Sequence, residues 1–382
     1  MFSLLWLTAC SRIPVPEIPS YKAGDKATVV RMHILHTVDM GVLPLVKVKL
    51  GPTVGWWLID TGSSHNLVAS DLVQRAQLRV VGSSDVATIG GRQLSTHHQL
   101  PVLQIGQLKL DGQSASAIDL SGLSAHHGYK IDGVLGMPAL GKLVMALDFR
   151  SRTVRFSDTA SGLRAGGIPF DLSRGVPIAR LALGNNRQGN FILDTGNATA
   201  LVILPSLPLA NRDKPLHFVE VADLGGMIPT QLALLPQLRL GQRQFRNVPV
   251  SLPLRNHHLA GADGSLGNMI LSRQEIIFDF PRQRLFLQAF NQQPASLPGD
   301  FGFLLSPDNR VSVINDQSSA AIAGLRRGDQ IVAVGGQRPG TDSAHSIWQL
   351  LSRRQNAELT IRRNGQLITR QLQRAYYLPV VE

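Results

Sequence analysis

The fold is decided by Trp57-Leu58-Ile59-Asp60-Thr61-Gly62, a stretch that recurs 134 positions later as Phe191-Ile192-Leu193-Asp194-Thr195-Gly196. In each copy an apolar run suited to a buried strand leads directly into Asp-Thr-Gly. Glycine lets the chain turn tightly and brings its N–H close to the carboxylate, and the threonine hydroxyl can bond across to a partner loop. Each aspartate is therefore expected on a loop at the end of a strand.

Further matches lie outward from these two stretches, in the same order and at offsets of 131 to 135 residues. The paired segments are Leu43-Pro44-Leu45 with Val176-Pro177-Ile178, Ile105-Gly106 with Leu240-Gly241, Asp132-Gly133-Val134-Leu135-Gly136 with Asp263-Gly264-Ser265-Leu266-Gly267, and Leu147-Asp148-Phe149 with Phe278-Asp279-Phe280. Collinear matches at a nearly constant offset indicate a tandem duplication.

Both copies predict a mainly β structure. Their segments are short, rich in Val, Ile and Leu, and interrupted by Gly, Pro and Asn. In one of them Val46 and Val48 alternate with Lys47 and Lys49, as in a strand with one buried and one solvated face. This pattern is typical of a sandwich or barrel.

A glycine pair lies between the Asp-Thr-Gly element and the later glycine element of each copy, Gly90-Gly91 in the first and Gly225-Gly226 in the second. Such pairs suit the turn of a β-hairpin, and a hairpin that covers a cleft would be a flap. An ordinary surface hairpin explains the same residues equally well, so these four glycines are flap candidates.

A two-fold related pair of Asp-Thr-Gly loops would place Asp60 and Asp194 face to face. Two carboxylates a few ångströms apart cannot both ionise, so they share a proton and titrate as a coupled pair. Such a dyad can hold a water molecule, with one carboxylate withdrawing its proton while the other hydrogen-bonds a carbonyl. This chemistry hydrolyses a peptide bond.

With these motifs, residues 40–290 resemble the aspartic peptidases, in a retropepsin-like form with both lobes fused in one chain. The resemblance implies two β-barrel lobes, at 37–160 and 168–290, with a cleft between them. It makes Asp60 and Asp194 the catalytic pair, and implies that Val134-Leu135-Gly136 packs against the first catalytic loop. The supporting loop residues are Thr61, Gly62, Ser63, Thr195, Gly196 and Asn197.

The second copy departs from the family pattern at two positions. Ser265 stands where the family has an apolar residue, and Asn197 stands where Ser, Thr or Ala is more frequent. We expect the Ser63 hydroxyl and the Asn197 amide to donate to their carboxylates. Hydrogen bonds to the charged form lower a pKa, so activity at acidic pH is expected.

Other repeated residues are interpreted without a catalytic role. Asp132, Asp148, Asp263 and Asp279 lie beside glycine or in strand-like runs, and a turn or surface position is expected for them. The histidine pairs at 97–98, 126–127 and 257–258 lack metal-binding spacing, so no metal site and no cofactor is predicted.

Residues 299–376 resemble a PDZ domain of the bacterial protease type. The resemblance is carried by Ala323-Gly324-Leu325-Arg326-Arg327-Gly328-Asp329-Gln330-Ile331, followed by a predicted helix at 343–351 and a hairpin around Asn364-Gly365. It implies that the loop of Phe301, Gly302 and Phe303 binds the terminal carboxylate of a polypeptide. Packing against the protease is the alternative role.

The amino terminus contains Leu7-Thr8-Ala9-Cys10, which resembles the lipidation signal of bacterial lipoproteins and includes the single cysteine of the chain. The apolar run is short and lacks a preceding Lys or Arg, so either the start lies further upstream or the resemblance is accidental, and we favour the upstream start. We expect residues 1–10 to be a signal segment, residues 11–36 a tether, and the protein to lie on the periplasmic side of a bacterial envelope, anchored through Cys10.

Composition excludes several classes of protein. The 382 residues are 43% hydrophobic and 17% charged, typical of folded domains. The formal charge of +12 is scattered rather than gathered in a basic stripe, so no nucleic-acid partner is expected.

Two functions from different classes remain open at this point. One is an aspartic endopeptidase whose PDZ domain binds polypeptide substrates or partners. The other is a non-catalytic peptide-binding scaffold, suggested by Asn197 and Ser265.

Pairing of the lobes within one chain, as a monomer, is preferred over pairing between two chains of a homodimer. The reason is that the short linker between the copies gives each lobe a high effective concentration near the other.

Overall fold

The computed structural model describes residues 27–36, 41–88, 91–127, 129–158, 166–207, 217–223, 226–254, 260–288, 301–305, 308–314, 318–340, 346–347, 350–351 and 354–374. The predicted signal segment with Cys10 and the first part of the tether lie outside these residues, so lipidation stays a prediction. None of the helices in the described residues is long and apolar enough to span a membrane.

The first lobe is built on a 10-stranded sheet that is mainly antiparallel. Its strands are β2 (His33–His36), β3 (Val42–Leu50), β4 (Thr53–Ile59), β5 (Leu67–Ala69), β6 (Val80–Thr88), β7 (Gly91–Gln99), β8 (Leu103–Ile105), β9 (Leu108–Leu110), β10 (Ser114–Ile118) and β11 (Gly133–Leu135). The expected alternation holds in β3, where Val46 and Val48 are buried and Lys47 and Lys49 are exposed.

The second lobe repeats this plan in a 7-stranded sheet. Its strands are β15 (Ile178–Ala182), β16 (Gln188–Leu193), β17 (Leu201–Ile203), β18 (His217–Asp223), β19 (Gly226–Leu240), β20 (Arg243–Pro253) and β21 (Gly264–Leu266). In both lobes the strand that leads into Asp-Thr-Gly lies parallel to the strand of the later glycine element, β4 beside β11 and β16 beside β21. The duplication seen in the sequence is thus a duplication of topology.

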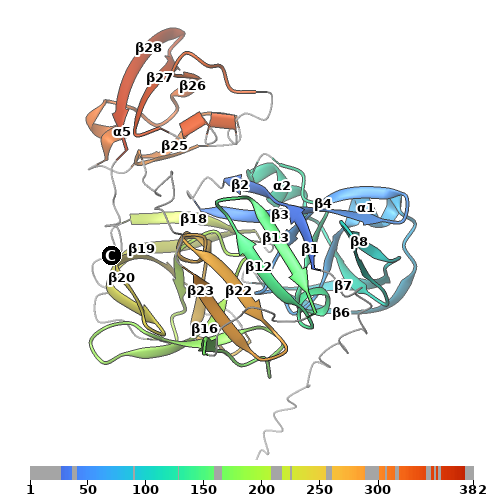
Figure 1. Cartoon of the computed structure of the whole chain (residues 1–382). Helices are drawn as coiled ribbons and strands as arrows, with labels where there is room; N and C mark the ends of the chain where they lie inside the picture. The colour runs from blue at the N-terminus through green and yellow to red at the C-terminus, as the bar shows by residue number, and fades with distance from the viewer. Residues whose placement is uncertain are drawn as a thin grey trace, which may run out of the picture.

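A third sheet joins the two lobes, in the strand order β1-β13-β12-β22-β23-β14 (Figure 1). Its strands are β1 (Thr28–Arg31), β12 (Val144–Asp148), β13 (Thr153–Ser157), β14 (Ile168–Pro169), β22 (Glu275–Asp279) and β23 (Arg284–Gln288). At its centre β12 and β22 are antiparallel, and Ala146 lies opposite Ile277, its own counterpart in the repeat. The pseudo-two-fold axis that relates the lobes therefore passes through this pair.

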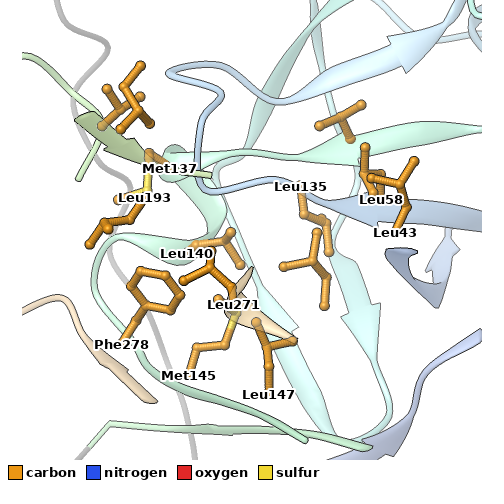
Figure 2. Close-up of a cluster of buried hydrophobic side chains, with 14 of the residues drawn as sticks. Leu43, Leu58, Leu135, Met137, Leu140, Met145, Leu147, Leu193, Leu271 and Phe278 are labelled. Carbon is orange, nitrogen blue, oxygen red and sulfur yellow. The ribbon is translucent and has the colours of Figure 1, made fainter. Parts of the chain in front are cut away.

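Hydrophobic side chains of both lobes form one continuous core around this sheet. Figure 2 shows Leu140 and Met145 of the first lobe beside Leu271 and Phe278 of the second. Phe278 is fully buried and stacks on Phe280 with ring centroids 5.2 Å apart. The lobes are accordingly one packing unit, not two independent domains.

The predicted tether is too long by about two strands. Residues 28–36 were expected to be part of it, but β1 pairs with β13 and β2 pairs with β3. Leu35 is fully buried and Val30 packs against the core, so apolar residues anchor this segment to the first lobe.

The helices of the molecule are short. They are α1 (Ser70–Arg75), α2 (Ser121–His127), α3 (Met137–Leu140), α4 (Asn268–Leu271) and α5 (Ser319–Ile322). α3 and α4 are related by the duplication, and each begins directly after the glycine element of its lobe.

The C-terminal module has a separate core of its own. It contains β24 (Phe303–Leu305), β25 (Val311–Ile314), β26 (Gln330–Val334), β27 (Asn356–Arg363) and β28 (Gln366–Gln373), and residues 346–347 and 350–351 are helical as predicted. Asn364 and Gly365 both have positive φ, at 49° and 82°, which confirms the predicted hairpin turn between β27 and β28.

Two separate cores predict two unfolding transitions. Phe278→Ala should destabilise the two-lobed body by about 3–5 kcal/mol, because it leaves a cavity where the lobes meet. Leu359→Ala, at a fully buried site of the C-terminal core, should lower only the other transition. Differential scanning calorimetry of the full chain checks both. A Phe278→Ala variant in which the two transitions fall together would contradict this division.

Candidate active site

Each Asp-Thr-Gly loop is positioned by a parallel strand pair. The Asp60 N–H donates to Leu135 O at 3.0 Å, and the Asp194 N–H donates to Leu266 O at 2.9 Å. The carboxylates thus follow the ends of β4 and β16, as the sequence predicted.

The two loops are held together by threonines that bond across the lobes. The Thr61 N–H donates to Thr195 Oγ1 and the Thr195 N–H donates to Thr61 Oγ1, both at 3.0 Å. Each hydroxyl in turn donates to a strand of the other lobe, Thr61 to Leu193 O at 2.6 Å and Thr195 to Ile59 O at 2.8 Å. Both threonines are fully buried, so these bonds are made without competition from solvent.

The threonine bonds bring Asp60 and Asp194 into hydrogen-bond contact with each other. The glycine of each loop lies against the opposite carboxylate. A Cβ on Gly62 would be 2.5 Å from Asp194 Cγ, and a Cβ on Gly196 would be 2.3 Å from Asp60 Cγ. Glycine is therefore required at both positions because of the approach of the partner acid.

Backbone N–H groups bind both carboxylates. Gly62 donates to Asp60 Oδ1 at 2.8 Å. Gly196 and Asn197 donate to Asp194 Oδ1 at 2.9 and 3.1 Å. These are the close backbone approaches that the Asp-Thr-Gly pattern predicted.

The side chains of Ser63 and Asn197 act differently from the prediction. The Ser63 hydroxyl donates to His65 O at 2.7 Å instead of to Asp60, because the tight turn after Gly62 directs it to its own loop. The Asn197 amide donates to Ser265 Oγ at 2.9 Å, and it is Ser265 that hydrogen-bonds Asp194.

Burial raises the pKa of both carboxyl groups. The pKa of Asp60 lies well above its ordinary value, because of burial and then the neighbouring Asp194 charge. Burial likewise raises the pKa of Asp194 to about 6, although its hydrogen bonds oppose the rise. The sequence predicted the backbone N–H groups at the carboxylates, but the side-chain hydrogen bonds expected from Ser63 and Asn197 go to other partners, and burial outweighs the hydrogen bonds that are made. The expectation of a low pKa is corrected accordingly.

Two buried asparagines support the loops, and the sequence reasoning missed both. The Asn66 side chain donates to Gln113 at 2.9 Å and accepts the Gly136 N–H at 3.0 Å. Asn268 Nδ2 donates to Thr195 O at 2.6 Å and, across the lobes, to Val42 O at 2.9 Å. The available signal for Asn268 was its place directly after the glycine element of the second lobe.

The repeated aspartates outside the loops have structural roles. Asp132 accepts the Trp56 N–H at 3.0 Å, and Asp263 accepts the equivalent Asn190 N–H at 2.8 Å. A surface position is wrong for Asp132 and Asp279, which are both buried. Asp279 does have the expected turn role, because it accepts the Arg282 N–H at 3.1 Å. Asp279 is paired with Arg282 at 3.0 Å.

In the part of the chain that the structure describes, no group of three or more His, Cys, Asp or Glu side chains gathers that could hold a metal ion. His97 is hydrogen-bonded to Ser84 at 2.6 Å and to Ser116 at 3.0 Å. The side chains at 126–127 and residues 257–258 lie outside the described residues.

Both predicted hairpins are present. Strands β6 and β7 pair as far as Thr88, which lies opposite Gly91. Strands β18 and β19 pair as far as Asp223, which lies opposite Gly226. Gly90 and Gly225 follow Thr88 and Asp223 in the sequence and lie outside the described residues. Their function as flaps stays a prediction.

The predicted peptide-binding loop opens the C-terminal module. Phe301 and Phe303 are buried in its core, and the φ of Gly302 is 81°. Gly302 O accepts the Ser318 hydroxyl at 3.1 Å, which ties the loop to the start of α5. Its last residue, Phe303, is the first residue of β24.

Comparison with protein families assigns two segments of the chain. Residues 46–139 match the aspartyl protease family. Residues 310–363 match the PDZ domain family. The aspartyl protease match contains Asp60 and the first glycine element, whereas the second Asp-Thr-Gly lies beyond it and rests on the repeat and on the geometry. No curated protein matches the chain significantly.

The threonine bonds between the lobes predict a large effect of a nearly isosteric change. Thr195→Val should lower the free energy of unfolding of the two-lobed body by about 1–3 kcal/mol for each buried partner left unpaired, here the Thr61 N–H and Ile59 O. Thr195→Ser keeps the hydroxyl and is the control. Equal losses in denaturant titrations of both variants would contradict the importance of these bonds.

The raised pKa of Asp60 predicts that Asp60→Asn stabilises the protein by an amount that depends on pH. Asp60 binds its proton more tightly in the folded than in the unfolded chain, so folding is penalised progressively as pH rises above the unfolded value. Asp60→Asn, which mimics the protonated acid, should therefore stabilise the protein more at pH 7 than at pH 4. Melting temperatures of both proteins across this range test it, and a difference that is independent of pH would contradict it.

Proposed function

We propose that the protein is an aspartic endopeptidase in which Asp60 and Asp194 activate a water molecule. The observation that carries the proposal is the hydrogen-bonded pair of carboxyl groups, one from each lobe, held by the buried threonines of both loops. Perturbed acids in a coupled, buried pair are typical of catalytic sites. The aspartyl protease match over the first lobe supports the same conclusion.

The proposed reaction uses the single proton that the dyad shares. The ionised carboxylate accepts a proton from water while the water oxygen bonds to the carbonyl carbon of the substrate. The protonated carboxyl group donates its proton to the carbonyl oxygen. The proton taken from water then passes to the amide nitrogen as the C–N bond breaks and a new amino terminus forms. A hydroxyl of the gem-diol returns its proton to the carboxylate that had protonated the carbonyl oxygen, which gives the new carboxyl terminus and restores the single shared proton of the dyad.

The PDZ domain implies peptide binding, and we propose that it holds a polypeptide substrate or partner by its carboxyl terminus. An extended peptide would add a strand beside β24, with its terminal carboxylate at the loop of Phe301, Gly302 and Phe303. β24 pairs on one side with β25 in the described residues.

We further propose that the protein acts on the periplasmic side of a bacterial envelope, anchored through a lipid on Cys10. The support is the sequence around Cys10 alone. The proposed unit is a single chain, which is supported by the hydrogen bonds between Thr61 and Thr195 and by the shared sheet.

The direct test is cleavage of an unfolded protein by wild type, Asp60→Asn and Asp194→Asn. Each substitution should lower kcat/KM by at least about 10²-fold, because it removes an acid or base of the reaction. Asp148→Asn is the matched control, since Asp148 accepts the N–H groups of Arg150 and Ser151 in a turn of the described chain. A wild type that leaves the substrate intact from pH 3 to 8 would favour the scaffold instead.

The same variants test whether the site is formed within one chain. A mixture of Asp60→Asn and Asp194→Asn should be as inactive as either alone. An active mixture, or activity of one variant by itself, would show that lobes of different chains pair.

A further inference from the structure

The two lobes differ at one buried position next to the dyad. On β11, Val134 lies beside Leu58 of the strand that leads to Asp60. The repeat places Ser265 of β21 at the equivalent point, beside Ile192. Both side chains are buried, yet only the second lobe has a hydroxyl there.

The hydrogen bonds around Asn197 determine which way that hydroxyl points. Asn197 Oδ1 lies 2.8 Å from the Thr199 N–H, which can only donate, so this atom of the amide must be the oxygen. The Thr199 hydroxyl donates to the same oxygen at 2.8 Å. The amide nitrogen therefore faces Ser265 Oγ and donates to it at 2.9 Å.

A serine hydroxyl has one hydrogen to donate. Because Ser265 Oγ accepts from Asn197, its own hydrogen is directed to its other partner, the Asp194 carboxylate. Asp194 thus has three donors from its own lobe, the N–H groups of Gly196 and Asn197 and the Ser265 hydroxyl.

In the residues of the first lobe that the structure describes, no side chain is an equivalent donor to Asp60. The Ser63 hydroxyl donates to His65 O, and Val134 has no polar atom. From its own loop Asp60 accepts the N–H groups of Gly62 and Ser63, and both of these donors are backbone groups. In the described part of the chain, Asp194 is the one titratable group that hydrogen-bonds Asp60, and His65, on the same loop, interacts with His97.

We propose that Ser265, oriented by Asn197, is a positioning residue that fixes the direction of the dyad: Asp194 is the ionised base that takes the proton of water, and Asp60 keeps the shared proton. The inference rests on the proposed peptidase function and assigns the roles within it. Donors that bind the charged form of one acid stabilise ionisation there and leave the proton on its partner.

This assignment gives a purpose to both departures of the second lobe from the family pattern. Asn197 and Ser265 form a relay to Asp194, so they are parts of the site and not signs of its decay. The residues of the chain itself determine which of the two acids is ionised, and no substrate is needed for this.

The test is the pH dependence of kcat for Ser265→Ala. Loss of the donor should raise the pH midpoint of the acid limb by about one unit. At pH values below that midpoint, kcat should therefore fall about tenfold. The alkaline limb, which reports deprotonation of Asp60, should stay in place. Asn197→Ala should shift the acid limb in the same direction. Ser265→Thr, which keeps the hydroxyl, should leave the acid limb where it is in wild type. An unchanged acid limb, or an equal loss at every pH, would overturn the proposal.

A second readout does not depend on turnover. In protein labelled with ¹³C at the Asp carboxyl carbons, the resonance that is missing in Asp194→Asn belongs to Asp194, and its titration midpoint should rise in Ser265→Ala. A midpoint that does not move would overturn the relay. If wild type cleaves nothing while this midpoint rises, the peptidase proposal fails and the relay stands.

Discussion

The rest of the structure depends on the hydrogen bonds between Thr61 and Thr195. These bonds are buried and reciprocal, so they can form only if the two lobes face each other with their strand ends in register. That constraint brings two acids into contact that would otherwise repel each other. It also explains why the residue after each threonine must be glycine, since each glycine lies against the opposite carboxylate. The shared sheet provides the rigid frame for this arrangement by placing the pseudo-two-fold axis through Ala146 and Ile277.

Much of this arrangement could be predicted from the sequence, because the duplication converts a weak local motif into a strong one. Two Asp-Thr-Gly stretches in equivalent contexts imply two-fold symmetry, and symmetry implies that Asp60 and Asp194 meet. The hairpins and the turn at Asn364 were predictable for a different reason, since they depend on neighbouring residues alone.

What could not be predicted depends on distant partners or on burial. Strand β1 pairs with β13, which lies more than a hundred positions away, so its segment looked like a tether. Ser63 was expected to donate to its carboxylate, but the loop gives its hydroxyl a nearer acceptor. The importance of Ser265 was hidden because residue type alone does not show which neighbour a buried hydroxyl faces. Likewise, the raised pKa of Asp194 follows from burial, and no motif reveals burial.

The shortest distance between a carboxylate oxygen of Asp60 and one of Asp194 decides whether the two acids share a proton. An atomic-resolution crystal structure of the full chain measures it directly. We predict a single oxygen–oxygen contact of roughly 2.5–3.0 Å within one chain, as expected when two acids share a proton. Oxygens beyond hydrogen-bond reach, or an Asp60 that instead meets an acid of another copy, would contradict the account.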